Sequence, residues 1–116
     1  MIDLSKEAPR SGREMLGGFA WLARMADKAK AKGTGTLGEY ISLCPMDEGF
    51  LLRSGVTEDA FVGLISSGAD DEEVASYFER NVGTAQRDAA NEWILVEMSD
   101  HVDEMDEEEG RALQRP

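Results

Sequence analysis

The sequence is poor in cysteine, histidine, proline and long apolar runs, and each shortage excludes a class of protein. Its 116 residues include one cysteine, one histidine and three prolines. A single cysteine cannot form an internal disulfide or a CxxC motif, which fits a reducing compartment. No apolar run approaches the ~20 residues of a membrane-spanning helix, and the first residues lack the layout of a signal peptide. We therefore expect a cytoplasmic protein without a membrane partner.

Basic residues are scarce in the second half of the chain. The formal net charge is −12, and it is unevenly distributed. Residues 1–53 hold eight Lys and Arg against seven Asp and Glu, whereas residues 54–116 hold four against seventeen. Nucleic-acid binding normally requires clustered Lys and Arg that neutralise phosphates, so this distribution argues against a nucleic-acid partner. It favours a basic protein as the partner of the second half.

The composition is that of one globular domain. Hydrophobic residues make up 41% of the chain and charged residues 31%, which is too apolar for a disordered protein. A chain of this length builds a single core, and it contains no internal repeat or low-complexity linker. We predict one helical domain over residues 1–116, with frayed ends at 1–8 and 110–116.

Helix caps and apolar spacing predict an all-α fold, a helical bundle of about five helices, two of them long. The pattern Ser-x-x-Glu at 11–14 is a capping box, and apolar residues follow it at spacings of three and four. A long first helix is therefore expected from near residue 12 to Gly33. Gly17 and Gly18 interrupt it, and two adjacent glycines imply a kink, a break or close contact with another backbone.

Three short capped helices and a long final helix are expected after an ordered glycine-rich loop at 33–45. The run Tyr40–Cys44 in that loop has no second segment with which to pair as a strand. The final helix is expected from residue 84 or 85 to about 107. The short helices have their own start and stop residues, namely Asp47 to Ser54-Gly55, Thr57 to Ser66-Ser67-Gly68, and Asp70 to Asn81 or Gly83.

Cys44 and His101 are the two side chains of the rarest reactive types. A nucleophilic cysteine needs a partner that favours its thiolate, and His101 is more than fifty residues away, so Cys44 is interpreted as a small core residue at a helix entry. His101 has Glu97 and Glu104 at i−4 and i+3 on the final helix. That trio could hold a divalent metal ion, although a histidine bonded to a neighbouring carboxylate is the favoured interpretation in so acidic a helix.

Polar residues of the first half suggest a small-ligand site between the first helix and the 33–47 loop. Lys28 and Glu39 belong to this polar group, and its three arginines could bind a small anion. The structural interpretation is an ion pair of Arg24 with Asp27 that fastens the loop. No glycine-rich segment matches a nucleotide-binding motif, so no cofactor is predicted. The candidate ligand-binding residues are Arg10, Arg13, Arg24, Asp27, Tyr40, Cys44 and Asp47.

Several motifs of the first half occur in a recognisable order. They are Pro9-Arg10-Ser11, Glu14-Met15-Leu16-Gly17-Gly18, Leu22-Ala23-Arg24-Met25, Asp27-Lys28-Ala29, Gly35-Thr36-Leu37-Gly38-Glu39-Tyr40 and Cys44-Pro45-Met46-Asp47. In them the chain resembles a family of small bacterial proteins known only as a domain of unknown function. The resemblance covers residues 9–55 well and continues loosely to Asn91-Glu92-Trp93. It implies no activity, ligand or catalytic residue.

The leading functional prediction is a non-enzymatic protein-binding or regulatory module of a bacterial cytoplasm. It depends on the acidic second half and on the lack of any assembled nucleophile, base or metal set. A small-ligand protein or an enzyme with its site between the first helix and the 33–47 loop is the alternative, and metal binding on the last helix is a weaker one. The chain is expected to be a monomer or a homodimer, the dimer built on the final helix and the apolar residues around Trp21 and Met25.

Overall fold

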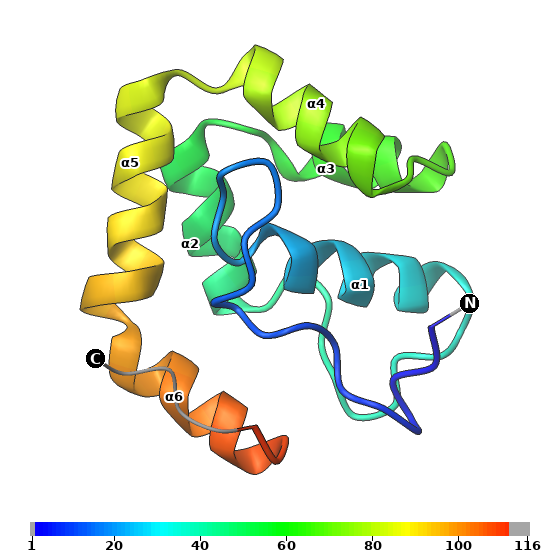
Figure 1. The fold of residues 1–116 in the computed structure, drawn as a ribbon. Coiled ribbons are helices and arrows are strands. Elements are labelled where there is room, and N and C mark those ends of the chain that lie inside the picture. The colour runs from blue at the N-terminus through cyan, green and yellow to red at the C-terminus, as the bar shows by residue number, and fades with distance from the viewer. Residues whose placement is uncertain (1, 112–116) are drawn as a thin grey trace.

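The computed structural model describes residues 2–111, and these residues form helices joined by turns and one long loop (Figure 1). Within that range there are six α-helices and no strand, so the all-α prediction is confirmed with six helices instead of five. None of the described helices is both long and apolar enough to cross a membrane. The elements are α1 (Leu22–Gly33), α2 (Pro45–Ser54), α3 (Glu58–Ser66), α4 (Asp71–Asn81), α5 (Thr84–Glu92), the π-helical turn η1 (Trp93–Glu97) and α6 (Ser99–Glu108).

The first helix begins about ten residues later than predicted. α1 starts at Leu22, and the preceding residues form turns. Gly17 and Gly18 adopt φ angles of 59° and 82°, which side chains disfavour, so the glycine pair produces a break instead of a kink. A Cβ atom on Gly17 would lie 2.8 Å from the Cβ atom of Ala75 in α4. The glycine therefore also permits the close backbone contact that the sequence suggested as an alternative.

The predicted capping box at 11–14 is wrong. The Ser11 hydroxyl donates to Asp106 Oδ2 at 3.0 Å, and the backbone N–H of Trp21 donates to the Gly12 carbonyl at 2.8 Å. The Ser11 oxygen also accepts the backbone N–H of Arg13 at 3.1 Å, but this local contact belongs to a turn and no helix follows it. Segment 9–20 consequently crosses in front of the helices instead of extending α1 (Figure 1).

The short helices follow their caps closely. Thr57 Oγ1 accepts the backbone N–H of Ala60, and Asp70 and Glu73 form the expected reciprocal capping box. α2 begins at Pro45, two residues before the predicted cap, and the Asp47 side chain accepts the backbone N–H of the residue before that proline. These helices end where the sequence predicts, at or beside small or amide residues.

The long final helix is divided into α5, η1 and α6. The backbone N–H of Met98 donates to the Trp93 carbonyl at 2.8 Å, an i→i−5 bond that puts one extra residue into the turn. The Trp93 ring packs directly on Gly49 of α2. A Cβ atom added to Gly49 would lie only 2.2 Å from that ring. The wide turn therefore coincides with the place where the last helices pack on α2, and α6 turns away below α5 (Figure 1).

The core is aromatic and lies among α1, α2, α3 and α4. Phe78 contacts Phe19, Phe50 and Phe61 at centroid separations of 5.5 to 6.4 Å. These four rings are at most 1% exposed. Trp21 and Met25 are also 1% exposed, so they are buried in the chain's own core and are not available for the predicted dimer contact.

The loop between α1 and α2 is ordered and contains no strand, as predicted. The backbone N–H of Leu4 donates to the Thr36 carbonyl at 2.8 Å, and Leu4 is 4% exposed. Gly38 adopts a φ of 61°, and a Cβ atom there would lie 2.8 Å from the Leu4 carbonyl oxygen. The fraying expected at 1–8 therefore does not extend to Leu4. Of the end expected to fray at 110–116, residues 110 and 111 donate backbone hydrogen bonds to Glu107 and Asp106, and the rest lies outside the described residues.

Candidate functional site

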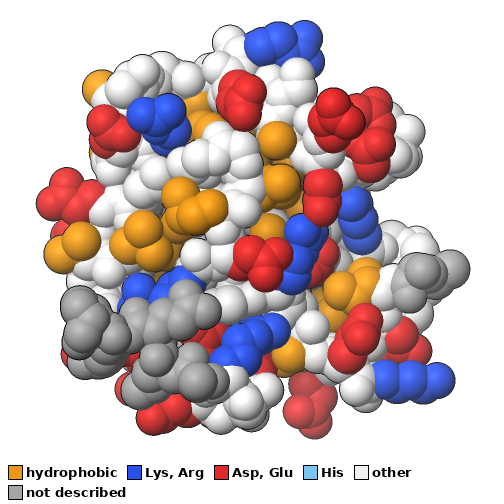
Figure 2. Space-filling model, viewed as in Figure 1, with side chains coloured by type: hydrophobic (Ala, Val, Ile, Leu, Met, Phe, Trp, Pro, Cys, Tyr) orange, Lys and Arg blue, Asp and Glu red, His pale blue; other side chains and the backbone are white. Residues whose placement is uncertain are grey.

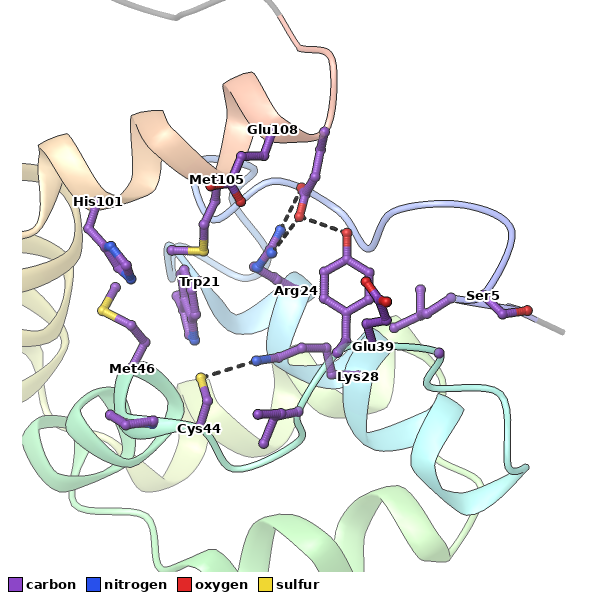
Figure 3. Close-up of a pocket in the computed structure, with 16 residues that line it drawn as sticks. Ser5, Trp21, Arg24, Lys28, Glu39, Cys44, Met46, His101, Met105 and Glu108 are labelled. Atoms are coloured by element: carbon purple, nitrogen blue, oxygen red, sulfur yellow. Dashed lines mark hydrogen bonds and ion pairs between the residues drawn. The ribbon is translucent and has the colours of Figure 1, made fainter.

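A cleft of about 770 Å³ lies between α1, the loop before α2 and α6. Figure 3 shows Met46, His101 and Met105 at one end, and Ser5 and Glu39 at the other. Between them lie residues of α1, the loop and the end of α6, namely Trp21, Arg24, Lys28, Tyr40, Cys44 and Glu109. The cleft thus lies in the region between the first helix and the 33–47 loop, where the alternative ligand site is predicted.

The thiol of Cys44 lies beside a buried ammonium group. Lys28 Nζ donates to Cys44 Sγ at 3.3 Å and forms an ion pair with Asp47 Oδ2 at 2.8 Å (Figure 3 draws the first contact). Asp47 is fully buried, and its other oxygen accepts the indole N–H of Trp21 at 2.8 Å. A buried charge needs such paired and hydrogen-bonded surroundings. These four side chains form one connected polar group, which we call the Lys28 cluster.

Local backbone structure presents Cys44 at the start of α2. Leu43 adopts a φ of 62°, a strained value for a leucine, and Cys44 itself is the extended N-cap residue. Pro45 then occupies the first helical position, where its missing N–H leaves no donor unsatisfied. The sequence Leu43-Cys44-Pro45 therefore turns the chain so that the sulfur lies over α1.

A second polar group ties α6 to α1. The Arg24 guanidinium donates to both carboxylate oxygens of Glu109, at 2.9 and 2.7 Å, and the Tyr40 hydroxyl donates to the same carboxylate at 2.9 Å. Arg111 also contacts this carboxylate. Burial acts to raise the pKa of Glu109, but the hydrogen bonds and charge of Arg24, with those of Tyr40 and Arg111, outweigh it and leave that pKa below its ordinary value of 4.5.

Two further polar contacts attach α6 to segment 9–20. Arg13 donates to Asp103 at 2.9 Å, and Ser11 donates to Asp106 at 3.0 Å. Val102 is the single apolar side chain of α6 that is fully buried in the described structure. Ion pairs therefore hold this wall of the cleft in place.

The pH dependence of stability should reveal this attachment. A carboxylate whose folded pKa is lowered stabilises the fold fully above its unfolded pKa, and that stabilisation is lost as the pH falls through the folded value. For Glu109 the loss begins near pH 4.5 and continues below it. Urea denaturation at a series of pH values should show the unfolding midpoint falling across this range. Glu109→Gln should be less stable than the wild type at pH 7, and its unfolding midpoint should fall less as the pH is lowered. A midpoint that falls as steeply as in the wild type would contradict the role of Glu109.

The other predicted ligand residues are placed elsewhere. Arg10 donates to Asp27 at 2.9 Å and to Asp71 at 2.7 Å, at a separate shallow cleft. The hydrogen bonds of Asp71 and Asp27 raise the pKa of Arg10, and Arg10 lowers the pKa of Asp71. Arg13 lines neither cleft. The three arginines therefore do not form one anion site, and Asp27 is paired with Arg10 instead of the predicted Arg24.

The predicted metal ligands are not brought together. Among residues 2–111 no three His, Cys, Asp or Glu side chains are grouped as a metal site. His101 lies on the cleft with half its side chain exposed, and Glu104 is 3.8 Å from its Nδ1 atom. The extra residue in η1 destroys the regular α-helical spacing that placed Glu97 on the face of His101.

Three of the seven predicted ligand residues line the cleft, namely Arg24, Tyr40 and Cys44, and Asp47 lies beneath it. Trp21 and Glu109 also belong to the site although no sequence pattern indicated them, and none linked Lys28 to Cys44. His101 lines the same cleft as Cys44, yet the described hydrogen bond of the sulfur is with Lys28. A lysine sixteen residues before a cysteine indicates a contact between them only if the loop that joins them is known to fold back.

These features define a small all-α domain with a cleft between its first helix, an ordered loop and its last helix. The chain belongs to the family described as a domain of unknown function (DUF5069), whose sequence profile matches residues 6–115. The resemblance in the first half is thereby confirmed and extends over nearly the whole chain. A comparison with curated proteins found no match.

Proposed function

We propose that the protein binds a small organic molecule in the cleft between α1, the loop before α2 and α6. The observation that supports the proposal is the size and lining of this cleft. Small-molecule sites typically have volumes of ~300–1,000 Å³ and combine apolar walls with a few placed polar groups. At about 770 Å³, with aromatic, thioether and charged side chains on its walls, the cleft fits that description.

The charges around the cleft favour a neutral or cationic ligand with an apolar part. Its two cations are already neutralised, Arg24 by Glu109 and Lys28 by Asp47. Glu39 and Glu108 are exposed and also line it. An anion would therefore meet excess carboxylate without an unpaired cation. The apolar part would contact the side chains of Tyr40, Ile41, Met46 and Met105.

Three aromatic probes of one size and different charge test this proposal. Benzylamine and benzyl alcohol are expected to bind more tightly than benzoate, measured by NMR titration of the purified protein. Reversing the rim charge in Glu39→Arg/Glu108→Arg should weaken benzylamine binding about tenfold, equivalent to about 1.4 kcal/mol. The effect of the charge reversal is local, because salt screening limits the range of interactions between exposed charges to about a Debye length, ~8–10 Å.

The matched control changes the same total charge away from the cleft. Glu97→Arg/Glu107→Arg replaces two exposed glutamates that do not line it, and benzylamine affinity should stay near the wild-type value. Equal weakening in both double variants would mean that binding reflects net charge alone. Binding of benzoate alone, or of none of the three probes, would overturn the proposal.

A basic protein partner is the second candidate, and exposed carboxylates on α6 favour it. Glu104, Glu107 and Glu108 are all exposed. A run of exposed carboxylates on a helix is usually a solvated face, and elsewhere on the face shown in Figure 2 red Asp and Glu side chains are interspersed with blue Lys and Arg side chains. The cleft is therefore the better supported of the two. Either candidate is consistent with a bacterial cytoplasm, where a free thiol such as that of Cys44 stays reduced.

A further inference from the structure

The Lys28 cluster has the arrangement of an activated nucleophile. Such a site places a nucleophilic atom within hydrogen-bonding distance of a second group that is oriented by a third. Here Cys44 Sγ is 3.3 Å from Lys28 Nζ, and Lys28 is held by Asp47 at 2.8 Å. Lys28 is 3% exposed, so its charge acts on the sulfur without full screening by water. Cys44 is partly exposed and lines the cleft.

We propose that Cys44 is a nucleophile that accepts an acyl group from a neutral ester or thioester bound in this cleft. The proposal deepens the proposed function, because it depends on the cleft for binding the ester and adds a covalent step. Helix N-termini and nearby lysines are the surroundings in which reactive cysteines are found. Cys44 has both, since it is the N-cap residue of α2 and contacts Lys28.

The step is an acyl transfer without oxidation or reduction. Cys44 Sγ attacks the carbonyl carbon, an S–C bond forms, and the bond between that carbon and the leaving oxygen or sulfur breaks. The leaving alcohol or thiol takes up one proton, equal to the one that the Cys44 thiol loses. Water then attacks the resulting thioester, which releases the acid and restores the thiol. Lys28 takes part as a hydrogen-bond donor, held in place by its ion pair with the buried Asp47 carboxylate.

Hydrogen-bond donors beside the sulfur favour a carbonyl substrate over other electrophiles. The negative charge of acyl transfer develops on the carbonyl oxygen and needs donors near the attacking atom. Lys28 carries three N–H bonds, and its acceptors among the described residues are Cys44 Sγ and Asp47. At the start of α2, Pro45 has no N–H and the Asp47 N–H is capped by the Cys44 side chain, so the Met46 N–H is the one there without an acceptor inside the helix. Alkylation or disulfide exchange would require no such donors.

Asp47 is a positioning residue in this scheme. It does not line the cleft, and it contacts Lys28, the Trp21 indole and the backbone N–H of Cys44. It therefore fixes both the donor and the start of the helix that presents the sulfur. The acidic rim of the cleft makes a neutral ester the favoured substrate class over a carboxylated one.

The test uses p-nitrophenyl acetate, a neutral activated ester, with the full-length protein. Wild-type protein is expected to release nitrophenolate in a burst and to gain the mass of one acetyl group, which peptide mapping places on Cys44. Cys44→Ala should lose both the burst and the acetylated peptide while keeping its melting temperature. Acetyl groups on lysines alone, or a burst that persists in Cys44→Ala, would overturn the proposal.

A test of the role of Lys28 requires a variant that still folds. Lys28→Met/Asp47→Asn removes both charges together, which avoids leaving one buried charge unpaired. Its acetylation at pH 7 should be slower by about tenfold or more, the scale of one hydrogen bond to a charged group, and should approach the wild-type rate only at higher pH. Lys30→Met changes a lysine of the same helix outside the cleft and should acetylate at the wild-type rate. Equal rates in all three proteins would contradict activation by Lys28.

The two proposals fail separately. Loss of acetylation with retained benzylamine binding would remove only the nucleophile. Acetylation of Cys44 without binding of any probe would retain the nucleophile and remove the proposed ligand class. If the double variant is unfolded by circular dichroism, the alkylation rate of wild-type Cys44 with iodoacetamide, compared with that of the same protein unfolded in urea, decides the question. A slower rate in the folded protein would overturn the assignment.

Discussion

Replacing Asp47 with alanine is expected to lower the free energy of unfolding by about 3–5 kcal/mol, the usual effect of removing one partner of a buried ion pair. Asp47 is fully buried and serves three donors, Lys28 Nζ, the Trp21 indole and the backbone N–H of Cys44. The substitution leaves the Lys28 charge buried without its carboxylate. Small domains are stable by only ~5–15 kcal/mol, so the loss is a large fraction of the total.

Urea denaturation followed by circular dichroism measures this loss. Glu48→Ala is the matched control, because the neighbouring Glu48 is exposed in the first turn of the same helix. It should lower stability by at most about 1 kcal/mol, the contribution of an acidic side chain at a helix start. A loss in Asp47→Ala no greater than in Glu48→Ala would mean that Lys28 is not held as a charged group by Asp47.

Local signals account for the part of the fold that could be predicted. Thr57 and Asp70 open helices because their side chains satisfy backbone N–H groups a few residues away, and this depends on sequence alone. Ser11 has the same chemistry and was predicted to cap a helix, but its hydroxyl donates to Asp106, ninety-five residues away. Its oxygen also accepts the backbone N–H of Arg13, yet a turn follows instead of a helix. No local rule distinguishes these cases, since the long-range contacts of this segment form only in the folded chain.

The sequence indicated the region of the cleft but not the pairings of the side chains around it. The concentration of glycine and mixed charge indicated the region between the first helix and the loop, where the structure has a cleft. Glycines let this loop pack tightly, as at Gly38 against Leu4. The side-chain contacts within the site could not be predicted from the sequence. Lys28 meets Cys44 because α2 starts over α1, and Glu109 reaches Arg24 because the π turn redirects α6. Each is a consequence of tertiary packing.

The interface of α2 with η1 should be the least tolerant of added volume. Gly49→Ala is expected to lower the free energy of unfolding by about 1–3 kcal/mol, the usual effect of overpacking. The new Cβ atom would lie 2.2 Å from the Trp93 ring, and real Cβ atoms essentially never approach within 3.0 Å. The ring is rigid, and its face carries the Arg53 guanidinium at 4.0 Å. Relief therefore requires α2 and η1 to move apart.

Gly63→Ala is the matched control for Gly49→Ala, since both glycines lie inside helices and neither has a positive φ. A Cβ atom at Gly63 would meet nothing within 4 Å. There the substitution should stabilise the protein by about 0.5–1 kcal/mol through the higher helix propensity of alanine. Thermal denaturation should thus shift the two variants in opposite directions. A higher melting temperature in both variants would show that the Trp93 ring can move away from residue 49 without cost, and that the π turn does not depend on their contact.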